Sequence, residues 1–295
     1  MSNVINYAEQ FSPFLVQKYE AESRSYGLLR SNPQVQWINA KTIKLPVISL
    51  TGYKDHDRNR LAFNTGSLEN KWEPKTLSFD RDVEFFIDAM DVDETNIVAS
   101  VANIQNVFET EQAIPESDAY RFSKLYADFV TYGGTVDTTA LTTANILEWF
   151  DTEMSKMDDA GVYEEGRLLY VTPAVHKILK EAEGLTRMLN VNPNNGSIYR
   201  NVHQLDDVEI IRVPSARFKT AYDFTEGFTP TGEQINAILV HPSAVVARER
   251  YDYIKMFAPG SDSRVGSSYV YQNRKYQDLF VLEQRVPGIA INAAE

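Results

Sequence analysis

The side chains best suited to chemistry in this chain of 295 residues are those of Asp55, His56 and Asp57. Carboxylates and imidazoles bind divalent metals, and a bound metal lets a hydrolase activate water. The three residues are adjacent in a stretch rich in glycine, asparagine and charge, and no fourth ligand accompanies them. A solvated loop explains them better, so a metal-dependent hydrolase is the weakest of the functions that we consider.

A second acidic cluster, Asp88, Asp91, Asp93 and Glu94, lacks the spacing of a calcium-binding loop, and helix capping accounts for it. The chain has four histidines, no cysteine, no serine in a nucleophile elbow and no glycine-rich phosphate loop. This is poor material for acid–base or nucleophilic catalysis. The sequence therefore predicts a protein that is not an enzyme, with no catalytic residue, no metal site and no cofactor.

Composition narrows the class of protein further. Hydrophobic residues make up 43% of the chain, enough for a core, yet there is no apolar run of the roughly 18 residues that a membrane span needs. No signal peptide is visible at the N-terminus, and the lack of cysteine fits a reducing compartment. A net charge of -12 argues against gripping nucleic acid through its phosphates, although not against enclosing it.

The charged residues around Asp55 lie at the tip of a predicted β-hairpin. Residues 42–50 have the pattern of a strand, and Pro46 removes a hydrogen-bond donor, so this strand should lie at a sheet edge or in a two-stranded ribbon. Residues 51–72 form a polar tip, and 76–87 return as the second strand. Because an isolated hairpin is marginal in water, we expect another molecule to stabilise it. The expected contact residues of the tip are Lys54, Asp55, Asp57, Arg58 and Arg60.

The hairpin leads into two predicted amphipathic helices within residues 91–131, placed end to end with Pro115 between them. Gly133 and Gly134 end the second helix. Its apolar stripe, which we expect to form a core, contains Phe122, Tyr126 and Phe129. Its polar residues should point elsewhere, among them Arg121, Lys124 and Asp128.

The middle of the chain has the pattern of a mixed α and β domain. A third helix is expected over residues 142–157. The segments 168–175 and 238–245 each contain a buried strand, a cap and a proline that opens a helix, which implies two like strands in one central sheet. Residues 208–213 supply another strand, and open loops are expected at 190–196 and 218–232.

The two ends of the chain differ in character. Residues 1–41 have the composition of a polar arm that lies on other molecules rather than building its own core. Near the C-terminus we expect short strands at 268–271, 278–282 and 288–292, the first two on either side of a polar turn.

Residues 107–127 resemble the spine helix of tailed-bacteriophage major capsid proteins, which have the Hong Kong 97-type fold. The likeness centres on the run Ile-Pro-Glu-Ser-Asp-Ala-Tyr-Arg at 114–121, and the order of elements along most of the chain also matches. The resemblance implies an α+β capsid fold with four parts. These are an N-terminal arm at 1–41, an extended loop at 42–88, a peripheral domain with the spine helix at 89–132 and 262–295, and a central-sheet axial domain at 133–261.

The same resemblance implies a structural protein that assembles with itself into hexamers and pentamers of an icosahedral shell. Such a shell encloses double-stranded DNA without sequence-specific binding, involves no membrane, carries a portal protein, and is assembled in the host cytoplasm before it serves in the virion. Only about 41 residues precede the hairpin, too few for a fused scaffolding segment, so a separate scaffolding protein is expected. An encapsulin-like nanocompartment shell is the nearest alternative.

Some members of this family join a lysine of the extended loop to an asparagine of a neighbouring subunit with the help of a buried glutamate. The candidates here are Lys54 and Lys71 on the hairpin and Asn273 near the C-terminal strands, and their spacing selects no pair.

Overall fold

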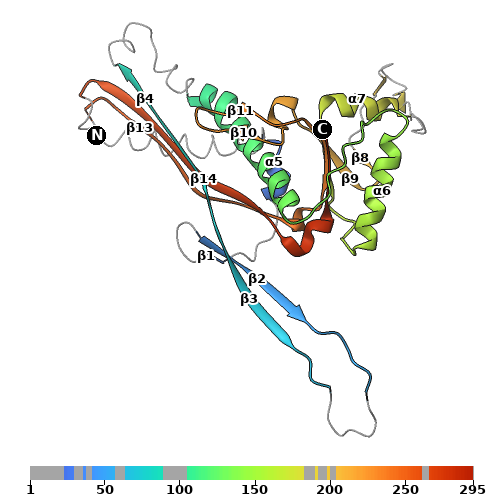
Figure 1. Ribbon diagram of the computed structural model, residues 1–295. Coiled ribbons are helices and arrows are strands. Elements are labelled where there is room, and N and C mark those ends of the chain that lie inside the picture. Colours follow the sequence, from blue (N-terminus) through green and yellow to red (C-terminus); the bar gives the residue numbers. More distant parts are fainter. Residues whose placement is uncertain are drawn as a thin grey trace.

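The structure, a computed structural model, describes residues 23–29, 36–37, 42–56, 64–88, 105–182, 190–191, 198–199, 204–260 and 266–294. These residues build a mixed α and β fold, as the sequence predicts. A five-stranded central sheet lies on one side, a long three-stranded sheet lies on the other, and a ribbon leaves the body of the molecule (Figure 1). Helix α5 (Ile114–Thr131) packs against both larger sheets, since its apolar residues share one hydrophobic cluster with both.

The central sheet has the strand order β15 (Ile289–Ala293), β12 (Ile235–Val240), β5 (Leu168–Val171), β9 (Val208–Arg212) and β8 (Gln204–Leu205). Strands β5 and β9 are parallel, and the other pairs are antiparallel. The predicted pairing of two like strands is confirmed, because β5 and β12 are neighbours. Alternate residues of β5 enter different clusters: Leu168 and Tyr170 face α5, whereas Leu169 and Val171 face the other side.

Two helices cover that other side, α6 (Ile146–Asp159) and α7 (Pro173–Glu181). Thr172 caps α7, as expected for the first strand–cap–proline unit. The second unit does not open a helix. Pro242 begins only the single turn η3 (Pro242–Ala244), because the β-branched Val245 and Val246 that follow start strand β13.

The long sheet consists of β13 (Val245–Phe257), β14 (Ser268–Val281) and β4 (Phe79–Asp88), all antiparallel. The predicted polar turn within residues 268–282 is wrong, because β14 is continuous through it. Its central polar residues bind partners on the helix beside the sheet: Asn273 and Lys275 contact Glu109, and Gln277 contacts Ser117. A strand can be polar where its side chains are satisfied in this way.

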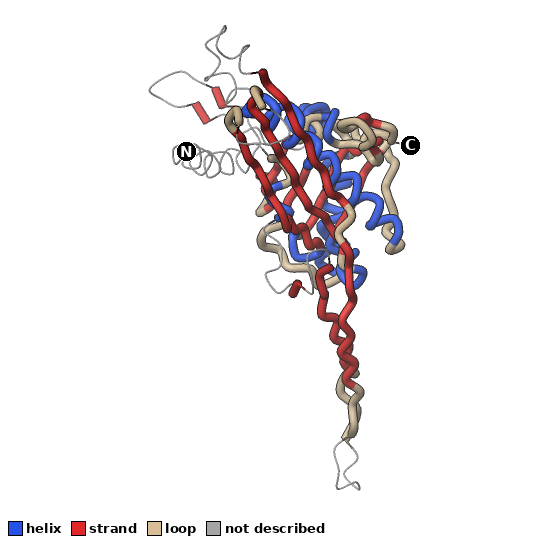
Figure 2. Tube along the Cα trace, turned by 90° about the vertical axis from the view of Figure 1, so that its left-hand side faces the viewer, coloured by secondary structure: helices blue, strands red, loops and turns tan. Residues whose placement is uncertain are grey.

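The ribbon is formed by β2 (Thr42–Leu50) and β3 (Leu68–Thr76), and it continues away from the helices beyond the long sheet (Figure 2). The second strand was therefore predicted wrongly: β3 pairs with β2, and β4 joins the long sheet instead. A third, short strand, β1 (Gln36–Trp37), pairs with β2 only at Ile43 and Lys44. At Pro46 the ribbon therefore has two strands, as expected.

The spine is helical without interruption from residue 105 to Thr131. Helix α5 begins at Ile114 with Pro115 in its first turn, as predicted. A π-helical turn, η1 (Glu109–Ala113), directly precedes it, and Ile114 N–H donates to the carbonyl of Glu109. This wider turn accommodates a proline, whose ring would clash with the carbonyl four residues earlier and which has no N–H to donate. Gly133, with φ of 80°, follows the helix. Residues 89–104, where the first helix was predicted, lie outside the described residues.

The N-terminal segment differs from the expected arm. Residues 23–29, which we call the strap, end in α2 (Tyr26–Leu29), and Leu28 is fully buried in the same cluster as α5. The loop at 218–232 is not open either. Phe218 is fully buried, and the ring of Phe224 lies edge-on to Phe79 and Tyr120.

Short elements complete the fold: η2 (Ser215–Arg217), η4 (Glu283–Gly288) and the two-stranded pairs β6 (Asn190–Val191) with β7 (Ile198–Tyr199) and β10 (Tyr222–Asp223) with β11 (Thr229–Pro230). The proposed domain limits stay predictions, and two strands do not respect them. Strand β13 pairs with β14 although it was placed with the central sheet, and β15 belongs to the central sheet rather than lying beside the spine.

Candidate interaction surface

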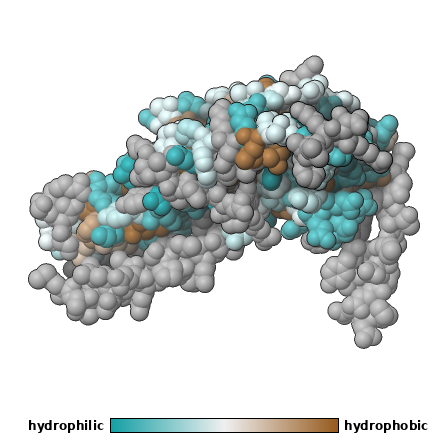
Figure 3. Space-filling model, turned by 90° about the horizontal axis from the view of Figure 1, so that it is seen from below, coloured by the Kyte–Doolittle hydropathy of each residue, from teal (hydrophilic) through white to brown (hydrophobic). Residues whose placement is uncertain are grey.

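The ribbon exposes large apolar side chains far from the core. Leu50 and Leu68 are cross-strand partners, 68% and 70% exposed, and Trp72 is 41% exposed. Leu68 and Trp72 lie on the same face of β3, because side chains alternate along a strand, and Glu69 and Glu73 lie on the other face. Elsewhere the described surface seen in Figure 3 is mostly hydrophilic, with small separate hydrophobic areas. An apolar face on a protruding ribbon is a typical contact surface for another protein.

The predicted tip residues are only partly placed. Lys54 and Asp55 are exposed at the end of the ribbon, and Asn64 bridges the two sides by donating to the carbonyl of Asp55 at 2.8 Å. Asp57, Arg58 and Arg60 lie outside the described residues, so their predicted contacts stay predictions.

The predicted spine stripe lies at the centre of the molecule. Phe122 is fully buried and meets the rings of Tyr170 and Phe218 edge-on, with centroid distances of 5.1 and 4.9 Å. Phe129 is buried, and Tyr126 is partly buried against the same cluster. These residues bind the spine to the central sheet rather than to another molecule.

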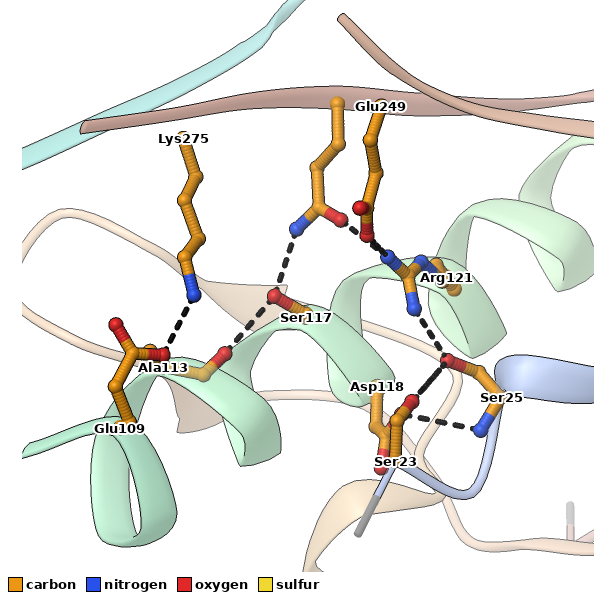
Figure 4. A network of polar contacts seen from close by, with 10 residues as sticks. Ser23, Ser25, Glu109, Ala113, Ser117, Asp118, Arg121, Glu249 and Lys275 are labelled. Carbon is orange, nitrogen blue, oxygen red and sulfur yellow. Dashed lines mark hydrogen bonds and ion pairs between the residues drawn. The ribbon is translucent and has the colours of Figure 1, made fainter. Parts of the chain in front are cut away.

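On another side of the spine, a buried polar network joins the helix to the strap (Figure 4). Asp118 is fully buried, and its carboxylate accepts hydrogen bonds from Ser23 Oγ at 2.8 Å, Arg24 N at 3.0 Å, Ser25 N at 3.1 Å and Ser25 Oγ at 2.7 Å. Arg217 of η2 approaches the same carboxylate at 3.4 Å. The buried charge is therefore matched by donors from two other segments, as a buried carboxylate requires.

One helical turn later, Arg121 connects the strap to the long sheet (Figure 4). Its guanidinium, 1% exposed, donates to Ser25 Oγ at 2.8 Å and also to Gln277 and Glu249. The prediction that Arg121 points away from the core is wrong, because the buried part of the helix is wider than its apolar stripe. The sequence signal that could have revealed such partners lies in β14, where the polar residues Asn273, Lys275 and Gln277 alternate along the strand and therefore share one face.

At the start of the spine, Asn273 lies beside a buried glutamate. Its amide Nδ2 donates to Glu109 and to Tyr271 Oη, and Lys275 Nζ lies 2.6 Å from the other carboxylate oxygen of Glu109. Asn273 and Glu109 are each 4% exposed. Burial, together with the charge of Glu109, raises the pKa of the Tyr271 phenol. The structure thus brings together an asparagine and a buried glutamate, which the sequence had not linked.

Within the described residues, no group of three or more histidine, cysteine, aspartate or glutamate side chains is arranged to hold a metal ion. Asp57 of the hydrolase hypothesis lies outside this set. His241 caps η3 and contacts Ser243 at 2.6 Å and the carbonyl of Glu165 at 3.1 Å, so its ring has a structural role. No helix in the described part is long and apolar enough to span a membrane.

Comparisons with known proteins give matches in structure only, since no protein-family model and no curated protein sequence matches the chain. The mature capsid of bacteriophage PhiM1 superimposes with a TM-score of 0.63 at 16% identity, over 86% of this chain and 82% of that one. The capsid of cyanophage P-SCSP1u gives 0.54 at 13% identity, over 86% and 84%. The virus-like particle from Pyrococcus furiosus gives 0.52 at 11% identity, over 97% and 99%. The chain therefore has the fold of the tailed-phage major capsid proteins.

Proposed function

We propose that this protein is the major capsid protein of a tailed bacteriophage, which assembles with itself into hexamers and pentamers of an icosahedral shell around double-stranded DNA. The observation that carries this proposal is the ribbon of β2 and β3, an apolar contact surface projecting from a capsid fold. A separate scaffolding protein and a portal protein are the further partners, and the shell forms in the host cytoplasm before it becomes part of the virion.

The ribbon supports assembly because the described residues of its own chain leave its apolar side chains exposed. Burying apolar surface gives roughly 25 cal/mol per Å², so leaving Leu50, Leu68 and Trp72 in water forgoes stabilisation that a neighbouring copy would provide. The acidic composition fits a container, because a subunit with a net charge of -12 is not suited to binding the phosphates of packaged DNA.

The nearest alternative is an encapsulin-like compartment, favoured by the likeness to the virus-like particle from Pyrococcus furiosus. The two functions differ in what the shell contains. A phage head encloses nucleic acid and needs a portal, whereas a compartment encloses protein cargo.

Coexpression with the proposed scaffolding protein of the same phage tests the proposal directly. We expect hollow shells of uniform diameter in electron micrographs, and Leu50→Asp with Leu68→Asp should abolish them while leaving a folded subunit. Glu69→Asp, on the opposite face of β3, is the matched control and should assemble normally. A wild-type subunit that stays monomeric under these conditions would refute the proposal, and shells that copurify with a defined protein cargo would favour the compartment.

The pair of Asn273 and Glu109 favours a second activity, a covalent bond between copies. A lysine nitrogen of a neighbouring copy would attack Cγ of Asn273 and form a C–N bond, the bond to Nδ2 would break, and ammonia would leave. Glu109 would take the proton from the lysine and pass it to the leaving nitrogen. The competing explanation is structural, because Lys275 of the same chain already pairs with Glu109.

Denaturing gel electrophoresis of mature shells separates these explanations. Crosslinking gives bands of two and more joined subunits, and mass spectrometry finds a lysine–asparagine peptide lighter by one ammonia. Glu109→Gln should abolish the bands while shells still form. Single-subunit bands from wild-type shells would assign Asn273 and Glu109 a structural role alone.

A further inference from the structure

The ribbon leaves the body at a turn that is held by one buried carboxylate. Asp278 of β14 is 2% exposed. It accepts hydrogen bonds from Ser78 N at 2.8 Å, Ser78 Oγ at 3.0 Å and Tyr120 Oη at 2.8 Å. Ser78 lies between β3 and β4, where the chain passes from the ribbon to the long sheet, and Tyr120 belongs to the spine. Asp278 therefore joins the ribbon base, the long sheet and the spine at a single point.

Further contacts surround this point. Tyr276 Oη donates to the carbonyl of Leu77 at 2.6 Å, and Lys75 Nζ of β3 donates to Tyr132 Oη at 3.1 Å, just beyond the end of the spine. A small hydrophobic cluster places Ile43 at the base of β2 in contact with residues of β13 and β14. The base of the ribbon is thus attached to the body by both polar and apolar contacts, although the ribbon itself is exposed.

We propose that Asp278, Ser78 and Tyr120 are positioning residues that set the direction of the ribbon and thereby the curvature, and hence the diameter, of the assembled shell. This inference rests on the proposed function, because it concerns how the ribbon meets the next copy. Apolar packing alone permits small rotations, whereas two hydrogen bonds from Ser78 fix the turn on a carboxylate that Tyr120 Oη and Leu279 N hold in place.

The length of the ribbon makes this angle important. Nine residues of extended strand span roughly 30 Å, so a rotation of about 10° at the base moves the far end by roughly 5 Å. Such a displacement exceeds the tolerance of a hydrogen bond, which is a few tenths of an ångström. Because every copy in a closed shell repeats the same contact, a systematic change of angle alters the curvature of the whole shell.

The test measures ribbon direction and shell size separately. The chain has no cysteine, so Thr51→Cys on the ribbon and Glu148→Cys on α6 allow two spin labels to be attached to the subunit. We expect a narrow distance distribution by pulsed electron paramagnetic resonance in the parent. We expect a broader one with Ser78→Ala and Tyr120→Phe together, which leave the backbone N–H of residue 78 as the one hydrogen bond from the turn to Asp278. Without labels, the same double variant should form shells of altered or mixed diameter, or open sheets.

Val208→Ala is the matched control, because Val208 is fully buried in the cluster beneath α6, on the far side of the central sheet. It lowers the melting temperature without touching the ribbon base, and its shells should keep the wild-type diameter. An unchanged distance distribution in the double variant overturns the inference. A broadened distribution with shells of wild-type diameter also overturns it, because curvature is then set elsewhere. Failure of the wild type to form shells bears on the proposed function instead, and the distance measurement still tests the ribbon.

Discussion

The sharpest test of the fold concerns a single hydroxyl group, that of Ser25 in the strap. Ser25 is fully buried, and its Oγ donates to Asp118 at 2.7 Å while it accepts from Arg121 at 2.8 Å. Ser25→Ala removes both hydrogen bonds. Hydrogen bonds to charged groups contribute about 1.5–3 kcal/mol each, but both charges keep other partners. We therefore expect a loss of about 2–4 kcal/mol in the free energy of unfolding.

Urea unfolding, followed by circular dichroism, measures this loss. Ser23→Ala is the matched control, because Ser23 Oγ donates to the same carboxylate at 2.8 Å and its only other hydrogen bond is to Ser25 Oγ among the contacts that the structure describes. It should cost less, about 1.5–3 kcal/mol. Hydrogen exchange adds a local reading: the amides of Arg24 and Ser25, which donate to Asp118, should exchange faster in Ser25→Ala.

Two results would refute this reasoning. If Ser25→Ala costs less than about 0.5 kcal/mol, the typical size of a surface change, the strap does not satisfy the buried charges. If Ser23→Ala costs as much as Ser25→Ala, the Ser25 hydroxyl, which contacts both Asp118 and Arg121, stabilises the fold no more than a single hydrogen bond does.

Three further predictions concern the spine and the ribbon. Phe122→Ala should cost about 3–5 kcal/mol and give insoluble or misassembled protein; an unchanged melting temperature would show that the stripe is not a core. Arg58→Glu with Arg60→Glu should leave circular dichroism unchanged but reduce shell yield, with partial recovery in salt; normal assembly at low salt would exclude an acidic docking surface. Burial, with the charge of Asp278, raises the pKa of Tyr120, so the folded state keeps this proton after the unfolded chain loses it and stability should fall as pH rises above about 10. Tyr120→Phe should flatten that fall in alkaline thermal melts.

The elements that were predicted correctly are those with a clear pattern of apolar residues. The strands at 168–171, 208–212 and 235–240 and the second spine helix lie close to the expected positions, because they bury their side chains against neighbouring layers. The capsid fold itself followed from the order of these elements around the spine.

Elements with polar side chains were predicted poorly. Most of strand β3, Leu-Glu-Asn-Lys-Trp-Glu-Pro-Lys-Thr, falls within the predicted polar tip, because its apolar residues Leu68 and Trp72 are separated by polar and charged ones. The middle of β14 was assigned to a turn for the same reason. The middle of β14 is a strand because it pairs with β13 and β4, and its polar side chains are satisfied by the spine. Strand β4 and the spine are distant in the sequence, so no local pattern reveals these contacts.

The candidate site shows the same division. The sequence predicts contacts at the hairpin tip from its length and charge, which are local properties, and this stays a prediction. It did not identify the residues that orient the hairpin, since Asp278 and Ser78 are separated by two hundred positions and neither looks unusual in its own segment. Arg121 was likewise predicted to point away from the core, although its guanidinium is buried.

The distribution of polar and apolar contacts follows from what each interface must do. The central sheet is covered by hydrophobic clusters on both faces, which supply most of the stabilisation but are not directional. Between the spine and the long sheet, by contrast, buried charges and amides meet through hydrogen bonds of defined geometry. A buried ion pair adds little net stability compared with apolar packing, but a displaced partner leaves a charge uncompensated at a cost of about 3–5 kcal/mol. Sliding of the sheet along the spine is therefore penalised far more than in an apolar interface. The ribbon extends from this sheet, so a register held by polar contacts gives every copy the same ribbon position, which a closed shell of identical subunits requires.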